Sequence, residues 1–233
     1  MELDYLERLL EGAAAGHGEF VLCTGPAGVG KTRLAEELST IADSLGVPVA
    51  WAVAPDLNSA PAYSLWQRVF ASAADLGLDH PEAGPVPESF WSLVVGPEAV
   101  TRVAADDGTA SDRFVIFEAA HQRLTRLAHP HGLVVVLDDL HLADIDSLAL
   151  LVHMVRHLRG SRLLIVATVR DLGGVDDSTR IINGLLAEMG TSLIELGGLG
   201  ADAVQAILTD AGIESSGHWC RLCSNGLLET PSW

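Results

Sequence analysis

A glycine-rich stretch near the N-terminus contains the residue types most suited to holding an anion. It reads TGPAGVGKT from Thr24 to Thr32 and includes Lys31, the only lysine in the chain. Glycines at this spacing let backbone N–H groups converge on phosphate oxygens, and a flexible ammonium can follow a phosphate into the loop. The pattern G-x-x-x-x-G-K-[ST] is typical of a phosphate-binding P-loop. The expected nucleotide-binding residues are Gly25, Pro26, Ala27, Gly28, Val29, Gly30, Lys31 and Thr32.

A triphosphate site also needs a metal and a carboxylate to hold it. Asp138 and Asp139 follow the apolar run LVVVL. We expect Asp138 and the Thr32 hydroxyl to bind Mg²⁺, and Asp139 to orient or polarise an attacking water. The alternative is that the two aspartates begin a helix as N-cap residues.

Arg170 ends a second apolar run, LLIVATVR, which places it at the carboxyl edge of the predicted sheet. Ligands bind at this edge in α/β proteins, so Arg170 is a candidate to sense a third phosphate. The alternative is an ordinary ion pair with the next residue, Asp171.

Apolar runs typical of buried strands alternate with helical periodicity along the chain. This alternation predicts an α/β fold of the P-loop NTPase kind, a parallel sheet covered by helices on both faces. We expect the ATPase core to span residues 1–212. We expect residues 213–233 to form a short atypical tail, because they lack a clear apolar period.

The charge balance limits the partners of the chain. With 31 acidic and 14 basic residues the formal net charge is −17, which disfavours direct binding to nucleic acid or to anionic membranes. Three cysteines form no disulfide framework, no apolar run is long enough to cross a bilayer, and the N-terminus lacks a secretion signal. These features favour a cytoplasmic location.

The motifs together resemble the ATPase domain of the STAND class of AAA-related proteins, as found in large LuxR-type bacterial transcriptional regulators. The matching stretches are GPAGVGKTRLAEEL, APAYSLWQ, SDRFVIFEA, VVVLDDLHLADIDSLALL and LLIVATVRD. The resemblance implies that a sensor strand lies between two other strands. One of these leads into the P-loop, and the other leads into Asp138. It also implies slow ATP hydrolysis, an ATP/ADP switch, Asp139 as catalytic acid, Arg170 as sensor, and self-association or regulator domains as partners.

The C-terminus departs from this family. The resemblance implies a lid with a Gly-Asn-Pro motif, whereas the chain ends HWCRLCSNGLLETPSW. Codons regrouped from Cys223 onward allow a string containing Gly-Asn-Pro. This suggests the hypothesis that residues 213–233 are a truncated, out-of-frame tail, which the nucleotide sequence of the gene would test.

Two other activities stay open at this stage. One is an inert fragment that binds no nucleotide productively, and the other is a P-loop kinase for a small molecule. Whether the chain is an enzyme is open, and weak ATP hydrolysis is the favoured reading.

A zinc site at Cys220 and Cys223 with His218 lacks a fourth ligand. His153 and His157 are interpreted as half-exposed helix residues.

Overall fold

The computed structural model describes residues 2–55, 61–78, 110–170, 173, 176–188 and 191–198. Strands and helices alternate along most of this part of the chain. The strands are β1 (Glu19–Thr24), β2 (Val49–Val53), β3 (Leu133–Asp138), β4 (Leu163–Val169) and β5 (Thr191–Glu195). The helices are α1 (Glu2–Ala14), α2 (Lys31–Ser44), α3 (Ser64–Asp75), α6 (Ala110–Leu127), the 3₁₀ turn η2 (Leu140–Leu142), α7 (Ile145–Arg156) and α8 (Asp177–Leu185).

The five strands form one parallel sheet in the order β2-β3-β4-β1-β5. Strand β4 therefore lies between β1, which leads into the P-loop, and β3, which ends at Asp138. This is the strand order that the family resemblance implied. Every residue of β3 and β4 is buried, as expected for central parallel strands that read as continuous apolar runs.

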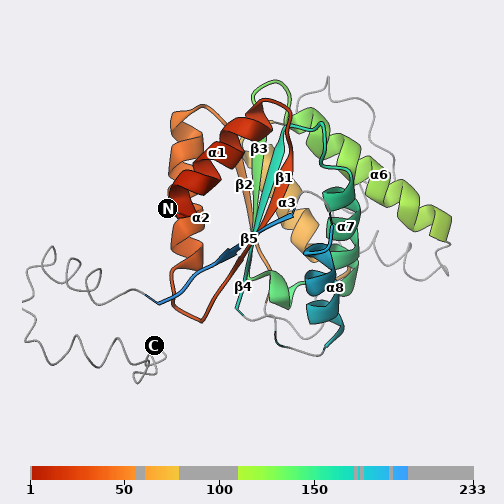
Figure 1. Cartoon of the computed structure of the whole chain (residues 1–233). Helices are drawn as coiled ribbons and strands as arrows, with labels where there is room; N and C mark the ends of the chain where they lie inside the picture. The colour runs from red at the N-terminus through yellow and green to blue at the C-terminus, as the bar shows by residue number, and fades with distance from the viewer. Residues whose placement is uncertain are drawn as a thin grey trace, which may run out of the picture.

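Helices cover both faces of the sheet, which confirms the predicted fold class (Figure 1). Alternate residues of each strand point to opposite faces, so β1 sends Val21 to one face and Leu22 to the other. Helices α1 and α2 pack on the first face, and α3, α6, α7 and α8 contribute to the core on the second. Two buried apolar layers therefore fix the sheet between the helices.

The sheet register brings three strand ends to one edge. Thr24 of β1 pairs with Val169 of β4, and Leu137 of β3 pairs with Ala167 of β4. The P-loop, the aspartate pair and Arg170 follow directly after these three strands. The backbone topology thus gathers sequence-distant polar residues at a single carboxyl edge, as parallel α/β sheets do.

Some expectations fall outside the described residues. These include the tail 213–233 and the cysteine pair at Cys220 and Cys223. Within the described part of the chain, none of the helices has the length and apolar content required to cross a membrane.

Candidate functional site

The P-loop between β1 and α2 depends on glycine backbone conformations. Gly28 and Gly30 have φ angles of +74° and +104°, which side-chain-bearing residues rarely adopt. Gly25, at φ +153°, also lies close to other backbone: a Cβ there would stand 2.5 Å from the carbonyl oxygen of Leu196. The sequence at these positions therefore allows a tight loop that begins helix α2 with its N–H groups facing outward.

Lys31 is bound within its own loop. Its side chain is buried, and Nζ donates hydrogen bonds to the carbonyl oxygens of Gly25 at 2.8 Å and Pro26 at 2.9 Å. Burial lowers the pKa of Lys31, and the nearby Asp139 carboxylate opposes that shift. The ammonium is thus held at the base of the loop, where phosphate oxygens would meet it.

Thr32 and Asp138 meet across the sheet edge. The Thr32 hydroxyl donates to the Asp138 carboxylate, with Oγ1 lying 3.1 Å from Oδ2 and 3.2 Å from Oδ1. A hydroxyl and a carboxylate are hard oxygen donors of the kind that bind Mg²⁺ beside substrate phosphates. Within the described residues, no group of three or more His, Cys, Asp or Glu is arranged as a metal cage. The donor set fits a Mg²⁺ that takes its remaining ligands from phosphate and water.

Asp139 adopts an unusual backbone conformation for a non-glycine residue. Its φ and ψ angles are 54° and 42°, in the left-handed region, at the start of η2. Its Oδ1 lies 3.8 Å from Nε of Arg170 and 4.0 Å from Nδ1 of His141. Asp139 stands at the N-cap position of η2, but its side chain makes no cap hydrogen bond to this turn.

Arg170 and His141 surround the Asp139 carboxylate with cationic or cation-forming groups. The Arg170 side chain is 58% exposed, so it can move toward a ligand. Burial lowers the pKa of His141, and the Asp139 charge works against that shift. His141 Nδ1 is buried without a hydrogen-bond partner, although Asp139 lies at ion-pair distance. The second reading of Arg170, a pair with Asp171, involves a residue outside the described part.

These residues enclose a cavity of about 260 Å³ at the carboxyl edge. Its lining is Ala27, Gly28, Gly30, Lys31, Thr32, Arg33, Asp139 and Arg170. Most of the predicted site residues therefore share one cavity. Gly25 and Pro26 support the cavity through their carbonyl oxygens, which accept hydrogen bonds from Lys31. The backbone N–H of Val29 donates to Pro26 O at 3.3 Å, which closes the loop.

Sequence reasoning missed two contributors. Arg33 lines the cavity and also pairs with Glu36 and Glu37 one turn along α2. Thr168 lies near the end of β4, and its buried hydroxyl contacts the aspartate pair. The signal in the sequence that could have identified Arg33 as a cavity residue is its position directly after Thr32. Cys23, beside the loop, is not a nucleophile candidate, because burial raises the pKa of its thiol to about 12.

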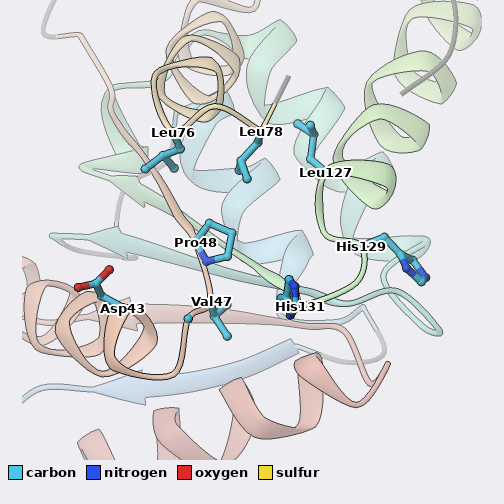
Figure 2. A pocket seen from close by; sticks show the side chains of 10 residues that line it. Asp43, Val47, Pro48, Leu76, Leu78, Leu127, His129 and His131 are labelled. Atoms are coloured by element: carbon cyan, nitrogen blue, oxygen red, sulfur yellow. The ribbon is translucent and has the colours of Figure 1, made fainter. Parts of the chain in front are cut away.

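A second cavity, of about 340 Å³, lies at the opposite edge, where β2 and β3 begin. Figure 2 shows Leu76, Leu78 and Leu127 around Val47 and Pro48, with His129 and His131 at one end and Asp43 at another. Among the described residues that line it there is no lysine or arginine. An anionic nucleotide therefore fits the P-loop cavity better than this apolar groove.

The fold and the P-loop geometry define a P-loop NTPase. A family model described as AAA ATPase domain matches residues 1–166, and the chain belongs to this family. The family implies that the domain binds nucleotide. No curated protein matches the chain.

Solved structures of distant relatives share the fold. Cdc6p from Pyrobaculum aerophilum is 18% identical with a TM-score of 0.53, covering 93% of this chain and 50% of its own. The ORC1 protein of Aeropyrum pernix, solved in complex with DNA, is 20% identical with a TM-score of 0.53, covering 91% and 48%. The chain thus spans about half the length of these two relatives. At such identities the likeness extends to the fold alone.

Proposed function

We propose that the chain is an ATP-binding, weakly hydrolysing switch domain of a signal-responsive transcriptional regulator of the STAND class. The main support is the hydrogen bond from Thr32 Oγ1 to Asp138 Oδ2, at 3.1 Å, beside a cavity that Thr32 and Lys31 line. Two hard oxygen ligands and one buried ammonium at this spacing suit a magnesium-bound triphosphate.

Each residue has a separate part in the proposed reaction. The backbone N–H groups of the P-loop and Lys31 bind the phosphates, and Thr32 with Asp138 hold Mg²⁺, which neutralises charge that builds up on the phosphate oxygens. Asp139 orients a water molecule toward the third phosphorus. The water oxygen bonds to that phosphorus as the bond to the ADP oxygen breaks, and the proton that the water loses passes to the Asp139 carboxylate. Arg170 stabilises the third phosphate.

The switch follows from the difference between ATP and ADP. Arg170 Nε lies 3.8 Å from Asp139 Oδ1. A third phosphate competes with Asp139 for the guanidinium, whereas ADP has no group that reaches it. We propose that this exchange couples nucleotide state to the structure of the Asp139 turn.

The formal charge of −17 leads us to propose nucleotide, and regulator domains or a second copy of the chain, as partners. Direct nucleic-acid contact is not part of the proposal, although the ORC1 protein of Aeropyrum pernix was solved with DNA. We propose the cytoplasm as the location, where ATP is abundant.

Calorimetric titration with MgATP and MgADP tests the proposal directly. We expect saturable binding to the wild-type chain and none to Lys31→Ala. Arg180→Ala is a matched control because it removes a cation that pairs with Asp177 on α8, away from the cavity. A folded wild-type chain that binds neither nucleotide would overturn the proposal. Transfer of phosphate to a small molecule without release of free phosphate would identify a kinase instead.

A further inference from the structure

Arg33 stands where a helix disfavours a positive charge. It lies in the first turn of α2, directly after Lys31 and Thr32, and this turn, which is described throughout, contains no acidic residue. The macrodipole of a helix places partial positive charge at its N-terminus, so an acidic side chain is favoured there and a guanidinium is not. The charge of Arg33 therefore opposes the stability of α2. An anion bound at the same helix end would interact favourably with both the dipole and the guanidinium.

Two acidic residues further along α2 hold the guanidinium of Arg33. Its Nη1 lies 3.3 Å from Glu36 Oε2, and its Nη2 lies 2.5 Å from Glu37 Oε1. The side chains are exposed to solvent, that of Arg33 to 71%. Exposed ion pairs contribute little, and a basic residue on the N-terminal side of its acidic partner is the weaker of the two orders on a helix. Arg33 can therefore exchange these carboxylates for a stronger anionic partner.

Arg33 also borders the cavity at the P-loop. The cavity lining contains three cationic residues, Lys31, Arg33 and Arg170. Lys31 is bound to carbonyl oxygens of its own loop, and Arg170 lies beside Asp139, which is itself a lining residue. The partners of Arg33 differ, because Glu36 and Glu37 are not among the described residues that line the cavity. Arg33 thus stands at the edge of the cavity, and the two carboxylates that hold it stand outside.

We propose that Arg33 binds a phosphate that ATP and ADP share, and that Glu36 and Glu37 compete with the nucleotide for its guanidinium. The inference rests on the proposed nucleotide function. Arg33 follows Thr32 at the N-terminus of α2, which serves either nucleotide, whereas the contact proposed for Arg170 needs a third phosphate. A guanidinium matches a phosphate through two parallel N–H···O bonds. Nucleotide binding then replaces two exposed carboxylate contacts with a charge-assisted pair at the cavity.

The test measures MgADP and MgATP affinity by calorimetry for the wild-type chain and three variants. Arg33→Gln removes the charge and keeps a long polar side chain, a double variant carries Glu36→Gln and Glu37→Gln, and a triple variant combines all three changes. We expect Arg33→Gln to lower the affinity for both nucleotides roughly threefold to tenfold, as loss of a partly exposed charge-assisted bond implies. The double variant should raise both affinities about twofold to threefold, because two exposed ion pairs no longer compete. The triple variant should match Arg33→Gln.

Arg180 and Asp177 on α8 supply matched controls. They form an exposed ion pair three positions apart, at 2.8 Å, and Arg180 is 73% exposed, close to the value for Arg33. Neither is among the described residues that line the cavity. Arg180→Gln and Asp177→Asn should leave both affinities within about twofold, because about 0.15 M salt screens charges that lie away from the ligand. The controls therefore separate a contact with the nucleotide from a change in net charge.

Unchanged affinities in Arg33→Gln would overturn the inference, and so would an equal loss in Arg180→Gln. A gain from Glu36→Gln and Glu37→Gln that persists in the triple variant would assign the effect to net charge and would also overturn it. A loss for ATP alone would contradict the shared phosphate. The urea midpoint of Arg33→Gln should stay close to that of the wild-type chain, because the substituted side chain is exposed. A wild-type chain that binds neither nucleotide would instead remove the proposed function itself.

Discussion

The guanidinium of Arg170 lies beside the carboxylate of Asp139, with 3.8 Å between Nε and Oδ1. The two residues follow neighbouring strands, β4 and β3, and are 31 positions apart in the sequence. The Arg170 side chain is more than half exposed, and exposed ion pairs contribute only about 0–1 kcal/mol. Arg170 can therefore leave Asp139 for a phosphate at little cost.

Arg170→Ala should reduce the preference for ATP over ADP. We expect a loss of roughly tenfold in ATP affinity, from one charge-assisted bond to the third phosphate, and an unchanged affinity for ADP. Titration with both nucleotides measures the ratio. Arg180→Ala, which removes an exposed arginine on α8, is the control and should leave the ratio unchanged. Equal losses for ATP and ADP would contradict the sensor role.

Gly25→Ala should destabilise the fold more than Gly28→Ala. A Cβ at Gly25 would lie 2.5 Å from Leu196 O, whereas a Cβ at Gly28 meets nothing within 4 Å. We expect about 1 kcal/mol for the backbone strain at Gly28 and roughly 1–3 kcal/mol more for the clash at Gly25. Urea denaturation of the two variants gives the comparison. Similar values would mean that the backbone at Leu196, just after β5, shifts to accept the added methyl group.

Asp144→Ala should be unusually costly for a helix-cap substitution. Asp144 caps α7 through Ser147 N at 2.8 Å and also accepts the N–H groups of Tyr63 at 2.9 Å and Ser64 at 3.2 Å at the start of α3. We expect about 2–4 kcal/mol, from one lost cap and buried N–H groups left without partners. Asp176→Ala removes a cap from α8 alone and should cost about 1 kcal/mol. Equal losses in the two unfolding free energies would argue against the shared cap.

Mild acid should destabilise the chain through His121 and His153. Burial lowers the pKa of both, and they lie near His157, Glu118 and Arg156. The unfolded state therefore binds more protons, so stability present above the unfolded pKa of about 6.5 falls as the pH drops below it. Urea midpoints at about pH 7.5 and about pH 5.5 measure this loss. His153→Gln should reduce the difference in urea midpoint between the two pH values. The midpoint of this variant near pH 7.5 measures the packing lost with the imidazole, and the difference between the two pH values measures the lost titration. An unchanged slope would assign the effect to other groups.

Local sequence predicted the strands and the P-loop well because both depend on short-range signals. The apolar runs predicted β3 and β4, and the spacing of the glycines and the lysine predicted the phosphate-binding loop at Lys31. The position of β4 between β1 and β3 came from the family resemblance, since periodicity does not determine strand order. Both histidines were expected to be half-exposed helix residues. His157 is exposed and caps the C-terminus of α7, whereas the His153 side chain, on α7, is 11% exposed and packs near His121.

Contacts between residues far apart in the chain could not be predicted from the sequence. Asp144 bonds to Tyr63 across 81 positions, and the Thr168 hydroxyl reaches Asp138 across 30. Such bonds depend on side-chain direction after the sheet has assembled, so a single sequence carries no pattern for them. The roles of Asp139 and Arg170 stay predictions that the nucleotide measurements test.

Lys31 uses two of its three N–H groups within its own loop. They donate to the carbonyl oxygens of Gly25 and Pro26. An ammonium has three donors, so one N–H is left for a phosphate oxygen while both carbonyl bonds persist. The same bonds satisfy a buried side chain that would otherwise be an isolated charge. The loop therefore presents a donor that is already oriented, and a bound phosphate does not have to order a flexible side chain.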